Sequence, residues 1–269
     1  MSIITISRGS YSYGAEIAEK VAQRLGCSCI SRDILLEASE QFNIPEIKLT
    51  KAIKDAPSIL DRLTQWKENY ISFIEATLLE HAQKDNMVYH GFAGHLFLKG
   101  VKHVLKVRII ADLEDRVRLV REREKISQEE AFHLVKKVDE DRRQWGLKLY
   151  GVDSSDPALY GLVINVAQVT VGDAVEMICH TARLASFKAT PESRSALDDL
   201  ALAAKLKARL LTVTPSVTVK AKGGTVFVNA VTDVSAESQV EREIREIAEQ
   251  MAGVVDVKIN IDFTAQRFL

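Results

Sequence analysis

The sequence lacks long apolar runs, an export signal and an excess of charge of either sign. No apolar run approaches the roughly 20 residues that cross a bilayer, so we predict no transmembrane segment. The first residues carry no basic stretch ahead of an apolar one, and we therefore expect no signal peptide. The formal net charge of −1 predicts that nucleic acid is not a partner, because such binding depends on neutralising many phosphates.

Cysteine is also scarce, with three in 269 residues. Cys27 and Cys29 alone are too few for a zinc site, and Cys179 lies far from them in the sequence. We interpret all three as reduced packing residues, which is typical of a cytoplasmic protein. The histidines show no spacing that would suit a metal ion. The sequence therefore favours a cytoplasmic protein that is stabilised by its core.

Apolar residues make up 46% of the chain and charged residues 27%, as in an ordinary globular protein with a packed core. The first two-thirds of the chain alternate short apolar runs with longer helical patterns, which predicts an α/β fold with a parallel sheet covered by helices. We expect this sheet to be doubly wound with right-handed connections. The expected strands are residues 3–7, 28–30, 86–90, 103–110 and 162–166, and the expected helices are residues 15–25, 32–42, 59–83, 113–124, 127–145 and 171–183.

The pattern changes after residue 187. Residues 188–198 are small and polar and include one proline, so we predict a linker between a first domain, residues 1–187, and a second domain, residues 199–269. Gly223 and Gly224 join two alternating runs, and such a pair predicts a tight hairpin with positive φ at both central residues. With a helix before the hairpin, and a helix and a strand after it, the second domain is expected to be a small αββαβ unit.

The most informative segment is the first expected strand together with the turn and helix that follow it. A strand, a turn of small residues and a helix form the usual frame of a phosphate-binding loop, because backbone N–H groups and the helix dipole face the anion. Gly9, Ser10, Ser12 and Gly14 are the candidate phosphate-binding residues. The usual Lys and Ser/Thr after the second glycine are absent, and Ala15 and Glu16 stand there instead.

Residues 1–187 resemble the cytidylate-kinase-like family of P-loop proteins, which are relatives of the nucleoside monophosphate kinases. The resemblance implies an ATP-dependent phosphotransferase that acts on a nucleotide or a similar small substrate, with ATP and Mg²⁺ as cofactors. The matching segments are residues 4–8, 14–18, 32–35, 88–94, 107–117, 121–124, 138–143 and 156–165.

The resemblance also implies roles for several charged residues. Arg8 is the cation nearest to the loop, and Arg121, Arg123, Arg142 and Arg143 match a lid whose arginines close over the transferring phosphoryl group. The alternative for these lid arginines is an ordinary helix surface with ion pairs between neighbouring turns.

Three further residues are candidates for substrate or metal binding, and two of them have an alternative role. Arg32 and Asp33 follow the second strand, where relatives bind the phosphate acceptor, although Asp33 also suits the start of a helix. Glu16 is a candidate Mg²⁺ ligand, and its alternative role is to complement the helix dipole in the first turn. Tyr11, Tyr13 and Phe92 depart from the usual pattern of such kinases, whereas His90 is expected to be structural.

Residues 199–263 resemble a BON domain in segments 217–219, 224–231 and 253–260. This resemblance implies a site for a ligand or a protein partner. From Asp199 to Leu269 acidic and basic residues balance at nine each, which argues against a polybasic lipid-binding patch.

Two functions follow from these observations. The first, which we favour slightly, is a phosphotransferase that holds ATP with Arg8 and the lid arginines. The alternative is a catalytically degenerate kinase fold that binds a nucleotide or a partner as a sensor or adaptor through the BON-like domain. The missing loop Lys and the tyrosines of the loop motivate this alternative.

Overall fold

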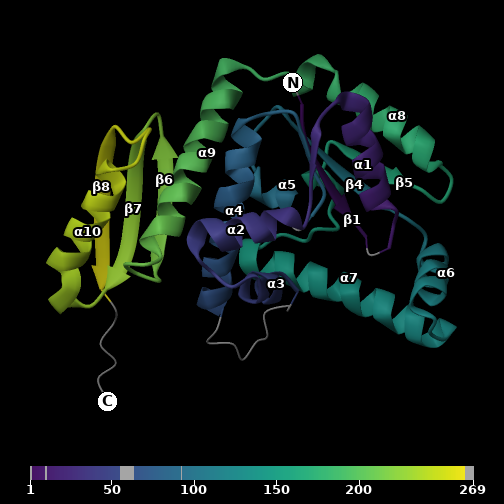
Figure 1. Cartoon of the computed structure of the whole chain (residues 1–269), viewed down its shortest axis with the longest axis horizontal. Coiled ribbons are helices and arrows are strands. Elements are labelled where there is room, and N and C mark those ends of the chain that lie inside the picture. Colours follow the sequence, from purple (N-terminus) through teal and green to yellow (C-terminus); the bar gives the residue numbers. More distant parts are fainter. Residues whose placement is uncertain (1, 10, 55–63, 92, 264–269) are drawn as a thin grey trace. The chain divides into compact units, whose positions relative to one another are not determined.

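The computed structural model describes residues 2–9, 11–54, 64–91 and 93–263 (Figure 1). The chain divides into two compact units. The first unit consists of Met1–Ile34, Ile53–Leu60 and Lys84–Thr190. The second consists of Leu35–Ala52, Asp61–Gln83 and Pro191–Leu269.

The first unit contains a five-stranded, all-parallel sheet in the order β2-β3-β1-β4-β5. The central strands β1 and β4 are rich in Ile and Val, as expected for strands that are covered on both faces. The predicted parallel sheet is therefore confirmed. The strands are β1 (Ile3–Arg8), β2 (Ser28–Ile30), β3 (Met87–Tyr89), β4 (Val104–Ile110) and β5 (Leu162–Asn165).

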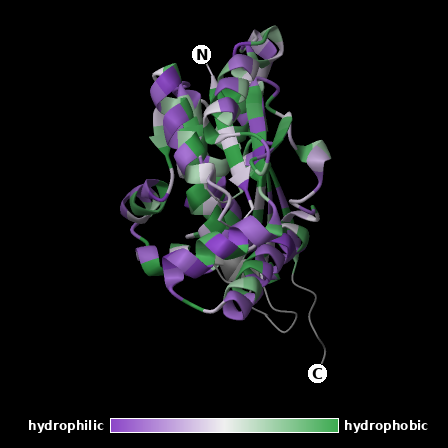
Figure 2. Cartoon of the chain, turned by 90° about the vertical axis from the view of Figure 1, so that its right-hand side faces the viewer, coloured by the Kyte–Doolittle hydropathy of each residue, from purple (hydrophilic) through white to green (hydrophobic). Residues whose placement is uncertain are grey.

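Two predicted helices, α1 (Gly14–Leu25) and α8 (Val171–Ala182), lie side by side against one face of this sheet (Figure 1). Ile17 of α1 and Ile178 of α8 are fully buried and pack with strand residues such as Val107 in one core. Figure 2 shows the same arrangement, with mostly hydrophobic strands inside and mostly hydrophilic helix faces outside. Burial of the apolar face of each helix thus holds the sheet and its cover together.

A helix pair, α6 (Leu113–Glu124) and α7 (Gln128–Tyr150), connects β4 to β5. A capping box starts α7, because Ser127 accepts from the Glu130 amide while the Glu130 side chain accepts from the Ser127 amide. Tyr11 of the loop after β1 packs against the small core between α6 and α7. The loop is therefore anchored to this helix pair.

The connections of β1 and β4 diverge. β1 leads through α1 toward β2 on one side of the sheet, whereas β4 leads through α6 and α7 to β5 on the other side. Neighbouring parallel strands whose connections diverge leave a crevice at their carboxyl ends, where ligands of open α/β sheets bind. The ends of β1 and β4 are thus the expected position of a site.

Several shorter elements complete the first unit. A tight turn at Ala93, which has a φ of 57°, starts the short helix α5 (Gly94–Phe97). The sequence pattern did not predict α5, because it spans little more than one turn. Two 3₁₀ segments are also present, η1 (Pro157–Leu159) and η2 (Ala185–Phe187).

The second unit combines three helices from the first half of the chain with the C-terminal segment. They are α2 (Asp33–Phe42), whose first two residues belong to the first unit, α3 (Glu46–Lys54) and α4 (Thr64–Gln83). The helix expected over residues 59–83 is found from Thr64, and its first five expected residues lie outside the described part of the chain. α3 was not predicted from the sequence pattern.

The expected linker, residues 188–198, is mostly helical. α9 (Pro191–Leu210) begins at Pro191 instead of Asp199, and proline is well tolerated in the first turn of a helix. Leu197 is fully buried and the apolar face of α9 packs along α4. α9 is thereby paired with α4, which lies within the expected first domain. The two compact units therefore do not follow the expected division at residues 187 and 199.

The C-terminal elements follow the expected order αββαβ. β6 (Val217–Lys222) and β7 (Thr225–Thr232) form an antiparallel hairpin, and β7 pairs in parallel with β8 (Asp256–Phe263). Gly223 and Gly224 have φ values of 57° and 80°, as predicted for the turn. The remaining elements are η3 (Val234–Ala236) and α10 (Glu237–Glu249). That this unit is a BON domain stays a prediction.

Two expectations from composition agree with the structure. Cys27, Cys29 and Cys179 are free thiols, and all three contribute to or pack against the core of the first unit. Among the described helices, none is long and apolar enough to cross a membrane.

Candidate functional site

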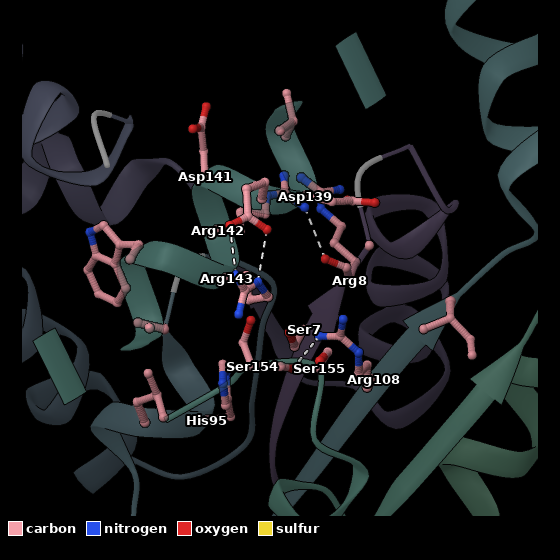
Figure 3. A pocket seen from close by; sticks show the side chains of 18 of the residues that line it. Ser7, Arg8, His95, Arg108, Asp139, Asp141, Arg142, Arg143, Ser154 and Ser155 are labelled. Atoms are coloured by element: carbon pink, nitrogen blue, oxygen red, sulfur yellow. Dashed lines mark hydrogen bonds and ion pairs between the residues drawn. The ribbon is translucent and has the colours of Figure 1, made fainter. Parts of the chain in front are cut away.

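A cavity of about 920 Å³ opens at the carboxyl ends of β1 and β4 (Figure 3). All the residues that line it belong to the first unit. The strand ends contribute Ser7, Arg8, Arg108 and Ile110, and the opposite wall comes from α7 and the segment after it. The cavity thus lies where the divergence of the strand connections predicts a ligand site.

Arg8 reaches the site across the start of α1. A Cβ added at Gly14 would lie 2.8 Å from Cδ and 2.9 Å from Cβ of Arg8, so only glycine leaves room for this side chain. The first backbone hydrogen bond of α1 runs from the Ile17 amide to the Tyr13 carbonyl, 3.0 Å away. The amides of the preceding turn are those that a helix leaves without an intrahelical partner. Arg8 therefore lies beside a helix N-terminus that attracts anions.

Arg142 of α7 lies next to Arg8. Its guanidinium donates a hydrogen bond to the Arg8 carbonyl oxygen at 3.0 Å. Burial lowers the pKa of Arg142, and the nearby charge of Arg8 lowers it further. Burial is also the main cause of the lowered pKa of Arg8, followed by the charge of Arg123. Two like charges are thus held close together in a partly desolvated position.

Arg108 of β4 forms the third corner of the site (Figure 3). Its guanidinium donates to the Ser154 carbonyl at 2.6 Å and to the Tyr160 hydroxyl at 3.3 Å. It also lies over the Tyr160 ring, 5.6 Å from the centroid. The Tyr160 hydroxyl donates to the same Ser154 carbonyl at 2.8 Å. Neutral groups therefore hold Arg108 in place, and the carboxylate that it influences, Asp153, lies beyond ion-pair distance.

Among the described residues, Arg8, Arg108 and Arg142 have no carboxylate within ion-pair distance. The other two arginines of the cavity are paired: Arg116 with Asp139 at 2.7 Å and Arg143 with Glu140 at 2.8 Å. Removing charge from water without a counter-charge is costly. We call Arg8, Arg108 and Arg142 the arginine triad, and its lack of direct ion pairs favours an anionic ligand such as a phosphate.

Two candidate phosphate donors of the loop are engaged within the protein. Ser12 is 1% exposed, and its hydroxyl lies 3.0 Å from the Gly9 carbonyl and 3.3 Å from the Ile109 carbonyl, so it donates within the fold. The Gly9 amide donates to the same Ile109 carbonyl at 3.0 Å. Ser10 lies outside the described residues. Among the described residues, the amides of the first turn of α1, beginning at Gly14, lack intrahelical partners and are the candidate phosphate donors.

We predict that Ser12→Ala lowers the free energy of unfolding by about 1 kcal/mol, because a buried hydroxyl loses its hydrogen bonds to the loop. Its affinity for ATP should change by less than about threefold, since the hydroxyl faces backbone carbonyls. Thermal unfolding and calorimetric titration measure the two effects. A fall in affinity of tenfold or more, with stability unchanged, would show instead that Ser12 contacts the ligand.

The structure brings some of the other sequence-predicted site residues together and leaves others apart. Arg143 lines the cavity with Arg8, Gly9 and Arg142. Arg121 and Arg123 lie on the exposed part of α6 outside the cavity lining, and Arg123 forms an ion pair with Glu124 at 3.4 Å. Their lid role stays a prediction, and the charge of Arg123 affects Arg8.

Arg32 and Asp33 are exposed after β2 and are not part of the cavity lining. Asp33 is the first residue of α2, in agreement with its alternative role at a helix start. The Glu16 carboxylate accepts from Lys20 at 2.7 Å on the exposed side of α1. In the described part of the chain, no group of three or more His, Cys, Asp or Glu residues is placed to hold a metal ion. The described residues therefore offer no site that would hold Mg²⁺ by protein side chains alone.

Several residues of the site were not predicted. Arg108 interrupts an apolar strand, and such a polar residue in a buried strand is the one signal that points to it. His95 is 7% exposed and lies against Tyr160, 5.1 Å between ring centroids. Burial, Arg108 and Lys106 lower the pKa of His95 to about 4, so its ring is neutral at pH 7. His95 itself therefore adds no charge to the cavity wall.

The fold and the site together define an α/β P-loop kinase-like protein. The chain belongs to the cytidylate kinase-like family, whose model matches residues 3–168. It is 25% identical over 190 residues to the cytidylate kinase of Pyrobaculum aerophilum, an alignment that covers 70% of this chain and 97% of the relative. It is 28% identical over 182 residues to that of Ignicoccus hospitalis, covering 66% and 97%.

A solved structure shares the fold. The crystal structure of an uncharacterized protein from Eubacterium ventriosum superposes with a TM-score of 0.51 at 18% sequence identity, and covers 68% of this chain and 98% of that chain. The chain is thus related in sequence to cytidylate kinases and shares its fold with this structure over 68% of its length. This relationship supports a phosphotransferase of the nucleotide-kinase type.

Proposed function

We propose that this protein is an ATP-dependent phosphotransferase that transfers a phosphoryl group to a nucleoside monophosphate or a similar small phosphate ester. The arginine triad carries this proposal, because three guanidinium groups without carboxylate partners surround a cavity at the carboxyl edge of the sheet. Phosphoryl transfer depends mainly on positioning and on stabilising negative charge. A cluster of unpaired arginines supplies both.

Arg8 takes the position that a loop lysine usually fills. Its side chain crosses Gly14 at the start of α1, so the helix N-terminus and the guanidinium face the same region. In this arrangement the phosphates of ATP bind at the start of α1 beside Arg8, and Arg142 stabilises the charge that develops during transfer. Arg142 donates a hydrogen bond to the backbone carbonyl of Arg8. The two residues are therefore adjacent at the cavity, and they act on one phosphate chain.

The neutral part of the cavity suits the organic part of a substrate. Ala93, Leu96 and Trp145 contribute apolar surface, and His95 contributes a neutral ring. Small-molecule sites commonly combine such apolar walls with a few polar anchors, and 920 Å³ lies within their usual range of volume. Because two relatives are cytidylate kinases, we propose a nucleoside monophosphate as the acceptor.

A second function remains in competition, namely nucleotide binding without turnover. It is favoured by the loop, because Ser12 and the Gly9 amide are engaged within the protein and the lysine is absent. Loss of one buried charge contact commonly costs about 2–5 kcal/mol, which is roughly a 30- to several-thousand-fold loss of rate. In this function the αββαβ unit, which we propose to be BON-like, binds a ligand or partner and reports nucleotide occupancy.

One pair of measurements separates the two functions. Calorimetric titration of the full chain with ATP should give a dissociation constant in the micromolar range, and incubation with ATP and each nucleoside monophosphate should produce a diphosphate from at least one of them. ATP binding without transfer to any monophosphate would favour the second function. No binding at millimolar ATP would contradict both.

A further inference from the structure

The charge around the cavity is strongly unbalanced. Its lining carries three carboxylates, those of residues 139–141, against six cationic side chains, so the lining has a formal charge of +3. The cations are Arg8, Arg108, Arg116, Lys136, Arg142 and Arg143. A phosphate chain that enters this cavity therefore meets excess positive charge before any metal ion is added.

Two of the three carboxylates that line the cavity are engaged by other side chains. Asp139 binds Arg116 at 2.7 Å, and Glu140 accepts hydrogen bonds from Arg143 and Gln144 at 2.7–2.9 Å. These hydrogen bonds lower the pKa of Glu140 to about 2. Asp141 points away from the arginine triad (Figure 3). In phosphate sites Mg²⁺ is usually held by one or two carboxylates together with phosphate and water oxygens, and among the described lining residues no unengaged carboxylate faces the triad.

The loop does not supply the missing ligand either. In a P-loop with the usual signature, the Ser/Thr that follows the lysine contacts the metal ion. Here that position is Glu16, whose carboxylate pairs with Lys20. The nearest loop hydroxyl, that of Ser12, is buried and donates to two backbone carbonyls. The loop position that usually supplies the metal ligand is thus Glu16, and its carboxylate is bound to Lys20.

We propose that this site binds its phosphorylated ligand free of a divalent cation, with the arginine triad in the place of the metal ion. This inference rests on the proposed function and specifies the form of the nucleotide, an uncomplexed polyphosphate. Free ATP carries about four negative charges at neutral pH, and its Mg²⁺ complex carries about two. Because Mg²⁺ coordinates the same oxygens that the arginines would contact, it competes with the triad for the phosphate chain.

The test is a calorimetric titration of the full chain with ATP in EDTA and again in excess Mg²⁺, at equal ionic strength and pH. The affinity should be at least about tenfold weaker in Mg²⁺, and inorganic tripolyphosphate should behave in the same way. An equal or higher affinity in Mg²⁺ would overturn this inference and leave the proposed function intact. No binding of ATP in either buffer would overturn both.

Two variants assign the effect to the triad. Arg142→Gln should weaken binding in EDTA and reduce the difference between the two buffers, because one of the competing cations is gone. Arg118→Gln is the matched control, since Arg118 lies on α6 outside the cavity lining, is 59% exposed and pairs with Asp115. Arg118→Gln should show the same difference in ATP affinity between EDTA and Mg²⁺ as the wild type. If Arg142→Gln kept the full difference as well, the triad would not be the competing group.

Discussion

Replacement of Arg8 by alanine is expected to weaken ATP binding by about 30- to several-thousand-fold, which corresponds to about 2–5 kcal/mol for the loss of a desolvated charge contact. Arg8 has this weight because it lies beside the N-terminus of α1, where under the proposed function it replaces the missing lysine. Calorimetric titration measures the change, and Arg118→Ala on the exposed side of α6 is the control that should bind as the wild type does. If Arg8→Ala bound ATP within about threefold of the wild type, Arg8 would not replace the lysine.

The same variant should raise the stability of the ligand-free protein. Burial and the charge of Arg123 lower the pKa of Arg8, so its charged form is less favourable in the fold than in the unfolded chain. This cost is present wherever Arg8 is protonated, which includes all pH values below its lowered pKa. Removal of the charge should therefore raise the melting temperature without ligand and lower it relative to the wild type in saturating ATP. A loss of stability in both conditions would assign Arg8 to the structure of the loop.

Gly94→Ala is expected to cause the largest loss of stability. A Cβ at this position would lie 2.4 Å from Cδ1 and 2.7 Å from Cε1 of Tyr89, whose side chain is 2% exposed. Tyr89 pairs with Thr5 and Ile30 across the sheet, so its ring has little room to move. Overpacking of this kind costs about 1–3 kcal/mol or more, and the melting temperature should fall by several degrees.

Gly172→Ala provides the matched control for this change. Gly172 lies in the first turn of α8, and the nearest atom to an added Cβ is Oγ1 of Thr170 at 3.7 Å. Alanine should therefore be neutral or stabilising there. In the double variant Gly94→Ala/Tyr89→Leu, part of the cost of the first change should disappear because the clash is removed. Fully additive effects would mean that the two residues do not interact.

The sequence pattern was sufficient for the sheet and for most helices. Alternation of short apolar runs with amphipathic segments depends on local periodicity, so β1, β4 and α1 were found nearly as predicted. The helix over most of residues 188–198 was not predicted, because the composition of this segment is typical of a linker. Leu197 is fully buried because α9 packs against α4. A local sequence pattern does not show this long-range contact.

The site was less predictable than the fold. Arg8 and Arg142 were predicted from the family resemblance, and the structure brings them together at the cavity. Arg108 was missed because it lies within a strand that reads as core, and only the strand order places it next to β1. Ser12 is a plausible phosphate donor in the sequence, since nothing local shows that its hydroxyl would find the carbonyl of Ile109. Roles that depend on long-range hydrogen bonds are thus invisible to a local pattern.

The position of the phosphates is the most direct test of the central claim that the arginine triad binds them. A crystal structure of the full chain with ATP should place phosphate oxygens within about 3 Å of the guanidinium groups of Arg8 and Arg142, at the N-terminus of α1. Phosphates bound elsewhere, with both guanidinium groups unengaged, would contradict the claim.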